Sequence, residues 1–226
     1  MFRRGQARRA SLPADRGGDR AEMVRDDLAN RGIKDKRVLA AMARVPREAF
    51  VPDHLKAYAY DDGPLPIGHG QTISQPYIVA LMAEAAEVTP ESTVMEVGTG
   101  SGYAAAVLAQ IARRVCTIER NAALSEAAKA RLASMGYGNI DVVTGDGSEG
   151  WPEAAPFDAI IAAAGAPEVP TPLKEQLARG GRLVIPVGPR GHQSLRRIRR
   201  TEEGFVDEDL GAVAFVPLIG RHGWSS

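Results

Sequence analysis

Apolar residues in the second half of the chain fall into short runs that are separated by longer segments with helical periodicity. Strands are predicted at residues 94–97, 115–118, 140–143, 159–163 and 183–187. Helices are predicted between them, at residues 103–112, 122–135 and 173–177. Such alternation predicts right-handed crossovers and a mostly parallel sheet that is covered on both faces. Beyond residue 191, runs at 195–200 and 213–216 have no helix between them, which predicts an antiparallel hairpin at one sheet edge.

The first half of the chain reads as helices followed by a loop. From Ala21 the pattern is helical, with a short helix and then a second one that is capped by Asp35 and ended by Pro46. Residues 60–74 are rich in Asp, Gly and Pro and predict a long loop, and a helix resumes at Pro76. We therefore expect one α/β domain over residues 21–226, with extra N-terminal helices.

Composition and charge narrow the class of protein. The 28 basic and 28 acidic side chains balance among 226 residues, so no global field would attract nucleic acid or anionic lipid. No apolar run approaches the roughly 20 residues that span a bilayer. Cys116 is the only cysteine, which favours a reducing compartment, the cytoplasm. Residues 1–20 are rich in arginine, glycine and proline, and we expect a disordered, solvated tail without a function.

A glycine-rich motif follows the first predicted strand. Glu96 is followed by Gly98, Gly100 and Gly102, where glycine lets the backbone turn tightly and approach a ligand. A dinucleotide motif needs its third glycine one residue later, where Tyr103 stands, and a phosphate-binding P-loop needs a lysine that is missing. The spacing resembles motif I of the S-adenosylmethionine-dependent methyltransferases. Alone, it also fits a tight turn that binds nothing.

Acidic residues follow the next two predicted strands. Glu119 has two oxygens that suit the paired hydroxyls of a ribose. Asp146 can accept a hydrogen bond from an adenine amine, while the Gly147 N–H can donate to a ring nitrogen. Glu96 would face the ammonium of the methionine moiety. Each acid alone could be a turn residue or a helix cap, but three successive strand ends with suitable groups predict a cofactor site.

A second motif, Pro66-Ile67-Gly68-His69-Gly70-Gln71-Thr72-Ile73-Ser74-Gln75-Pro76, lies upstream. Without further context it is an irregular connection in which Ser74 caps the next helix. It resembles the signature of the protein-L-isoaspartate O-methyltransferases. The resemblance extends from about Met23 to Gly220 and includes Arg37-Val38-Leu39, Val45-Pro46-Arg47, Phe50-Val51-Pro52, Ala164-Gly165-Ala166-Pro167 and Phe215-Val216-Pro217-Leu218.

The resemblance implies a Rossmann-like methyltransferase fold, doubly wound, with an antiparallel C-terminal edge. It implies that Ser74 is the active-site serine and that the backbone of Gln71, Thr72 and Ile73 helps hold a substrate carboxylate. The implied reaction moves a methyl group from S-adenosyl-L-methionine to L-isoaspartyl and D-aspartyl carboxylates of damaged proteins, starts their repair, and leaves S-adenosyl-L-homocysteine. The expected enzyme is a monomer that binds neither nucleic acid nor membrane. Ala163 and Ile219 depart from the hydroxyl residues that many relatives carry.

The implied chemistry explains which motifs are missing. A carboxylate with a pKa near ~4 is already an anion at neutral pH, so no general base is required. Ser74 is then an orienting donor and no nucleophile, and His69 has a structural or peripheral role. Three alternatives stay open: a methyltransferase for a small molecule or RNA, a non-catalytic sensor of an adenosine ligand, and a hydride-transfer enzyme.

Overall fold

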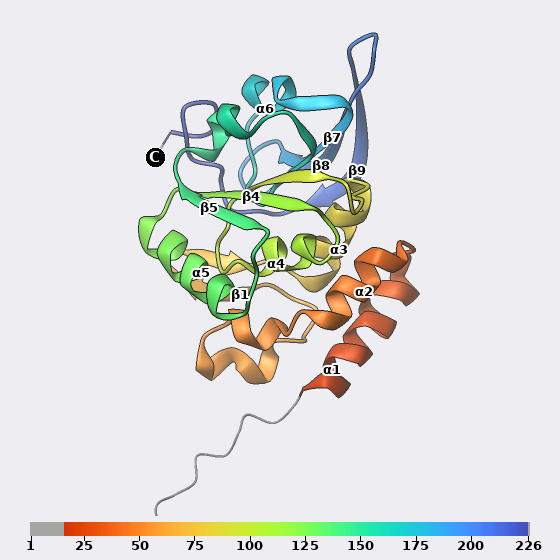
Figure 1. Cartoon of the computed structure of the whole chain (residues 1–226), viewed down its shortest axis with the longest axis vertical. Helices are drawn as coiled ribbons and strands as arrows, with labels where there is room; N and C mark the ends of the chain where they lie inside the picture. The colour runs from red at the N-terminus through yellow and green to blue at the C-terminus, as the bar shows by residue number, and fades with distance from the viewer. Residues whose placement is uncertain (1–15, 226) are drawn as a thin grey trace, which may run out of the picture.

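A computed structural model gives the structure of residues 16–225, which form an α/β fold around a seven-stranded sheet (Figure 1). The strand order is β5-β4-β3-β6-β7-β8-β9. The strands are β3 (Thr93–Val97), β4 (Arg114–Glu119), β5 (Ile140–Thr144), β6 (Phe157–Ala162), β7 (Leu177–Val187), β8 (Gln193–Arg200) and β9 (Phe205–Val213). From β5 to β7 all neighbours pair in parallel, which confirms the predicted parallel sheet.

The sheet is buried on both faces, and every residue of its central strands β3 and β4 except Arg114 is buried. On β3, Val94 packs into one core cluster, whereas Met95 and Val97 pack into the other. The first cluster lies under α2 (Lys36–Arg44), α3 (Pro76–Ala85), α4 (Tyr103–Ala109) and α5 (Ala122–Ser134). The second lies under α6 (Thr171–Glu175), whose Leu173 is fully buried. This two-faced burial places the carboxyl ends of β3, β4 and β5 together at one rim.

The C-terminal edge is antiparallel as predicted, but its outer strand is not where the sequence placed it. β8 pairs with β7 on one side and with β9 on the other, whereas residues 213–216 were expected to form that outer strand. β9 is held by cross-strand ion pairs, including Arg196–Asp207 at 2.9 Å and Arg197–Glu208 at 2.6 Å. β9 is largely exposed and has three consecutive acidic residues, 207–209, at its centre, so its sequence has no hydrophobic alternation that would reveal it.

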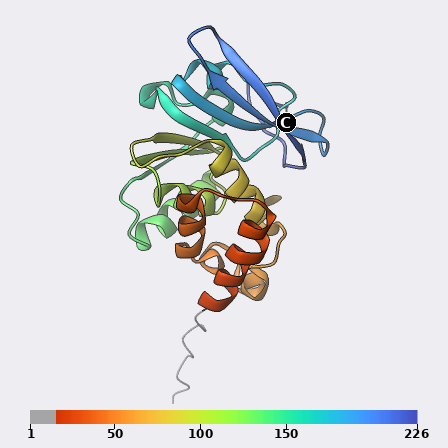
Figure 2. The same cartoon turned by 90° about the vertical axis from the view of Figure 1, so that its right-hand side faces the viewer.

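The N-terminal helices gather at the end of the molecule opposite the β8–β9 hairpin (Figure 2). They are α1 (Gly17–Glu22), η1 (Met23–Leu28), η2 (Ala29–Arg31), α2, η3 (Arg47–Phe50) and η4 (Asp53–Tyr58). The predicted cap of α2 is confirmed, because the Asp35 side chain accepts from the Arg37 N–H at 2.8 Å.

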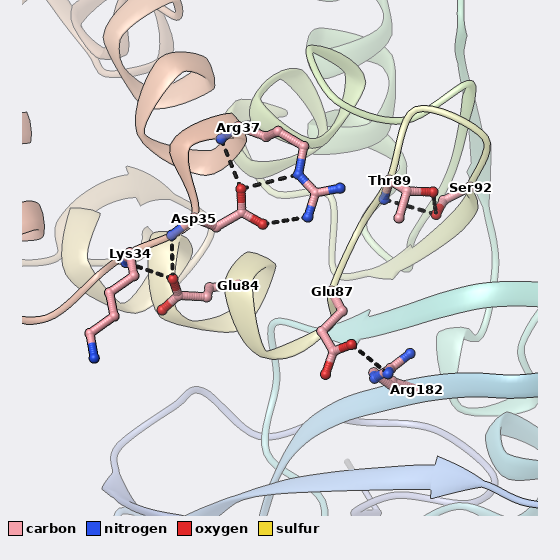
Figure 3. Close-up of polar contacts among 8 residues, drawn as sticks. All are labelled: Lys34, Asp35, Arg37, Glu84, Glu87, Thr89, Ser92 and Arg182. Atoms are coloured by element: carbon pink, nitrogen blue, oxygen red, sulfur yellow. Dashed lines mark hydrogen bonds and ion pairs between the residues drawn. The ribbon is translucent and has the colours of Figure 1, made fainter.

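Helix α3 connects these helices to the sheet (Figure 3). The Glu84 carboxylate accepts from the backbone N–H groups of Lys34 and Asp35 at 2.7 and 2.6 Å. Just past the helix, Glu87 pairs with Arg182 of β7 at 2.5 Å. In the following turn, Ser92 Oγ accepts from the backbone of Thr89 at 3.0 Å and leads the chain into β3. The C-terminal end of α3 is therefore anchored to the N-terminal helices on one side and to the sheet on the other. The N-terminal end of the same helix directly follows the second motif.

The expected boundary after residue 20 is wrong. Helix α1 begins at Gly17, and Arg16 and Arg20 both contact the domain. Arg16 donates to the Lys56 carbonyl, and Arg20 donates to the Tyr60 hydroxyl at 3.2 Å. These long-range partners could not be read from the local composition. The rest of the expected tail, residues 1–15, lies outside the described residues.

Two features are absent from residues 16–225. No helix in this part of the chain is long and apolar enough to cross a bilayer. In the same residues, no group of three or more His, Cys, Asp or Glu side chains is arranged to hold a metal ion.

Candidate active site

A cavity of about 410 Å³ opens at the carboxyl ends of β3 and β4. It is lined by the glycine-rich loop, the end of β4, the segment before α3, and the chain past β9. Nine of the predicted site residues line it: Gln71, Thr72, Ile73, Ser74, Glu96, Gly98, Gly100, Glu119 and Gly147. The two groups of residues that the sequence assigned to a cofactor and to an acceptor therefore share one cavity.

The glycine-rich loop needs its glycines for different reasons. Gly98 and Gly100 have φ angles of 94° and 53°, a region that side chains rarely adopt, and both line the cavity. A Cβ on Gly100 would lie 3.3 Å from Ile67 Cδ1, so the second motif, which contains Ile67, packs directly on this loop. Gly102 does not line the cavity. It starts α4 with φ 88°, and a Cβ there would face Leu132 of α5 at 3.2 Å.

Glu119 is held at the end of β4 with its carboxylate facing the cavity. One oxygen accepts from the Gly100 N–H at 2.9 Å and the other from the Asn121 N–H at 2.9 Å. Each oxygen keeps a lone pair for a ligand hydroxyl. Opposite, Gly147 must lack a side chain, because a Cβ would lie 2.5 Å from Val97 Cγ1.

Glu96 is a buried acid in the wall of the cavity. Its Oε2 accepts from Thr117 Oγ1 at 2.6 Å, and Thr117 in turn lies 2.6 Å from Thr99 Oγ1. Burial raises the pKa of Glu96 to about 8, the Thr117 hydrogen bond opposes that rise, and the nearby Glu119 charge adds to it. At neutral pH the carboxyl of Glu96 in the free site is therefore mainly in its neutral form.

Asp146 does not line this cavity. Its Oδ1 accepts from the Ser148 N–H at 2.9 Å and from Ser148 Oγ at 2.7 Å, and its Oδ2 accepts from the Arg221 N–H at 2.7 Å. The side chain thus caps the turn that presents Gly147 and fastens the C-terminal segment. The sequence indicated the turn, but it could not indicate that Arg221 would contact it.

The second motif forms a hairpin where the sequence predicted a loop. Strands β1 (Leu65–Gly68) and β2 (Gln71–Ile73) pair antiparallel, and His69 at their turn has φ 53° and lines the cavity. The alternative role of Ser74 as a helix cap is wrong. The N-cap of α3 is Gln75, without a capping side-chain bond, so this role does not occupy the Ser74 hydroxyl.

The sequence missed one wall of the cavity. Val216, Pro217, Leu218 and Ile219 line it, and the Leu218 N–H donates to the Gly165 carbonyl at 2.8 Å. These side chains carry no reactive group, and the run at 213–216 was taken for a strand. Tyr103, Arg120, Asn121 and Ala164 also line the cavity. The two departures, Ala163 and Ile219, both face it.

A parallel α/β sheet with a glycine-rich first turn and an acid at the end of the neighbouring strand defines a nucleotide-type ligand site at a topological switch point. The family model of protein-L-isoaspartate(D-aspartate) O-methyltransferase matches residues 19–223. The chain therefore belongs to the protein-L-isoaspartate(D-aspartate) O-methyltransferase family.

Individual relatives agree with this assignment. A protein-L-isoaspartate O-methyltransferase of Methylorubrum populi is 60% identical, over 88% of this chain and 94% of the relative. Protein-L-isoaspartate O-methyltransferase 1 of Rhodopseudomonas palustris is 57% identical, over 92% and 85%. Among solved structures, a protein-L-isoaspartate O-methyltransferase matches with TM-score 0.81 and 28% identity, over 90% of this chain and 67% of that one. A Plasmodium falciparum protein assigned to the same family, in complex with S-adenosyl-L-homocysteine, matches with TM-score 0.77 and 27% identity, over 88% and 98%.

Proposed function

We propose that this chain transfers a methyl group from S-adenosyl-L-methionine to the free carboxylate of L-isoaspartyl and D-aspartyl residues in damaged proteins, which initiates their repair. One observation carries the proposal. Ser74 and the strand Gln71–Ile73 line the same cavity as Glu119 and the glycine-rich loop. A carboxylate and a nucleoside bound there would face one another.

The residues present fit the cofactor. Glu119 would accept hydrogen bonds from the ribose hydroxyls, the Gly147 N–H would donate to the adenine ring, and Glu96 would face the ammonium. Gly98 and Gly100 leave room for close approach, because their backbone conformation excludes most side chains. Gly102 and Asp146 support this site from behind, through the start of α4 and through the turn at Gly147. For Asp146 to accept from the adenine amine, its bond to the Arg221 N–H would have to give way.

The chemistry asks this chain for positioning more than for proton transfer. The bound sulfonium supplies an electrophilic methyl group. Ser74 donates a hydrogen bond to one oxygen of the acceptor carboxylate, and the backbone of β2 holds the acceptor from the side. No base is needed, because the acceptor is already ionised at neutral pH. Since opposite charges neutralise as the methyl group moves, orientation and exclusion of water matter more than added charge.

The remaining features of the proposal concern the setting of the enzyme. It works as a monomer in the cytoplasm on protein and peptide substrates, without nucleic acid or membrane as a partner. The balanced charge of the chain supports the absence of a nucleic-acid partner. The single cysteine, Cys116, is buried in the core and fits a reducing compartment.

Matched peptides test the proposal. The chain is incubated with methyl-labelled S-adenosyl-L-methionine and with two peptides that differ only in one aspartyl or isoaspartyl linkage. We expect labelling of the isoaspartyl peptide and essentially none of its aspartyl twin, because the two differ in backbone geometry and share the same charge. Equal labelling of both peptides would contradict the isoaspartyl specificity. A chain that binds the cofactor and labels neither peptide would be a sensor.

A further inference from the structure

Arg47 is a buried cation without a carboxylate partner. It lies in η3 and its side chain has no exposed surface. Nε donates to the Ala59 carbonyl at 2.7 Å, Nη2 donates to the Gly63 carbonyl at 3.4 Å, and Nη1 has no hydrogen-bond partner. The guanidinium carbon lies 4.9 Å from the centroid of the Tyr103 ring. Burial lowers the pKa of this guanidinium, and the neighbouring Tyr103 opposes that effect.

A buried arginine of this kind is not expected to stabilise the fold more than an apolar side chain would. A buried charge without an opposite charge loses its hydration, and an apolar side chain of similar volume is commonly as stable or more stable at such a site. Two carbonyl bonds and a cation–π contact recover only part of that loss. The position therefore calls for a role that only a planar, multiply donating cation can perform.

The contacts of Arg47 join two parts of the site. Ala59 and Gly63 flank the segment that leads directly into β1 and so into the hairpin that ends at Ser74. Tyr103 is the first residue of α4, directly after Gly102, and it lines the cavity. Its ring also packs edge-on against Phe50, with ring centroids 5.5 Å apart. One guanidinium thus contacts the entry to residues 65–74, here called the acceptor segment, and the helix that follows the glycine-rich loop.

We propose that Arg47 is a positioning residue for methyl transfer, which sets the acceptor segment at Ser74 relative to the glycine-rich loop through Ala59, Gly63 and Tyr103. It is absent from the lining of the cavity, so it acts through these neighbours. The role rests on the proposed function. Displacements of about 1 Å at a reacting centre can change rates by about a hundredfold, so a loss of this brace should appear in turnover.

Two substitutions separate this role from packing and from charge. Arg47→Met keeps much of the volume and removes the charge and the donors. Arg47→Lys keeps the charge, but an ammonium cannot bridge two carbonyls while lying flat on a ring. Leu28→Ala is the matched control, because Leu28 is fully buried among the same N-terminal helices and contacts neither segment through hydrogen bonds.

The experiment measures kcat and KM for the isoaspartyl peptide, the Kd for S-adenosyl-L-homocysteine, and Tm in the same full-length variants. For Arg47→Met and Arg47→Lys we expect kcat to fall about tenfold or more, with Kd within about twofold of wild type. Leu28→Ala should lower Tm and leave kcat unchanged below its melting range. A wild-type kcat in either folded Arg47 variant, or an equal kcat loss in Leu28→Ala at matched stability, would overturn the role.

A double variant keeps the test decisive if Arg47→Met does not fold. Tyr103→Leu removes the ring, and Arg47→Lys with Tyr103→Leu should be no slower than the slower single variant, because both break the same brace. Multiplicative losses would overturn the proposal. Turnover by the wild-type chain tests the proposed function separately. If the wild-type chain methylates neither peptide, the proposed function fails and the role of Arg47 fails with it. If the wild-type chain is active and the Arg47 variants are unaffected, only the positioning role of Arg47 is refuted.

Discussion

We expect Glu96 to release a proton when the cofactor binds. The substitution Glu96→Gln should abolish this proton release. Glu96 is buried beside Thr117, and its pKa is raised to about 8, chiefly by burial. At pH 7 about nine-tenths of free chains then carry the neutral acid. An ammonium placed beside it favours the carboxylate, so binding releases about 0.9 proton at pH 7.

The sign of the pH dependence follows from this release. The bound state holds fewer protons than the free state, so affinity rises with pH up to the pKa of about 8 and then levels off. If the bound carboxylate stays ionised to pH 6, affinity should rise about fiftyfold between pH 6 and 8, or ~2.3 kcal/mol. Glu96→Gln removes this component and keeps the shape of the side chain.

The stability of the free chain should depend on pH with the opposite sign, which gives an independent test. Because the folded pKa is raised from 4.5 to about 8, folded chains hold more protons than unfolded ones in that window. The contribution of Glu96 to stability is complete below pH 4.5 and is lost as pH rises through about 8, at up to ~1.4 kcal/mol per pH unit. Glu96→Gln should flatten this decline.

Calorimetry in two buffers with different ionisation enthalpies counts the protons released when S-adenosyl-L-homocysteine binds. The free ligand titrates identically in both experiments, so the difference in proton release between wild type and Glu96→Gln reports the coupled pair of Glu96 and the ligand amine. A wild type that releases no proton at pH 7, or a variant with the same pH dependence as wild type, would refute the reasoning.

Three further predictions follow from named contacts. Glu119→Ala should weaken cofactor binding by about 1–3 kcal/mol, because hydroxyl partners lose a charged acceptor, and unchanged affinity in calorimetry would remove the ribose assignment. Ser74→Ala should lower turnover about tenfold to a hundredfold, since one hydrogen bond to an ion contributes ~1.5–3 kcal/mol, with much less change in cofactor Kd; loss of cofactor binding in a folded variant would contradict our division of roles. Removing residues 1–20 should lower Tm by a few degrees relative to removing residues 1–15, because only the longer deletion takes away the contacts of Arg16 and Arg20; equal melting temperatures would show that these contacts contribute nothing.

The parallel half of the fold could be predicted because each of its strands contains a short, mostly apolar run between helical segments. The same logic failed at β9, whose central residues 207–209 are acidic and face β8 through ion pairs. It also failed for β1 and β2, which are four and three residues long, with Pro66 and Gly68 in β1. Short strands of this composition look like a loop until a partner surface, here the glycine-rich loop, stabilises them.

The acids and glycines of the site could also be predicted from the sequence, because charged groups and glycines at strand ends restrict which ligands can bind. Its apolar wall was not, since Val216 to Ile219 acquire their role only by pairing with Gly165, about fifty residues earlier. Asp146 shows the same limit in a polar residue. Its place after β5 was evident, but the donor that occupies it, the Arg221 N–H, comes from a distant segment.

The arrangement of buried charges gives the two ends of the site different tasks. Within residues 16–225, Glu96 and Glu119 are the buried acids, and both lie at the end of the cavity formed by β3 and β4. A sulfonium cofactor with an ammonium brings positive charge to this end, which compensates Glu119 and favours ionisation of Glu96. The acceptor end is lined by neutral groups, Ser74 and β2, and is braced by Arg47 behind Tyr103. A substrate carboxylate that enters at the acceptor end lies next to no acidic side chain there. Electrostatic repulsion therefore opposes its approach to the methyl group less than it would at the end with Glu96 and Glu119.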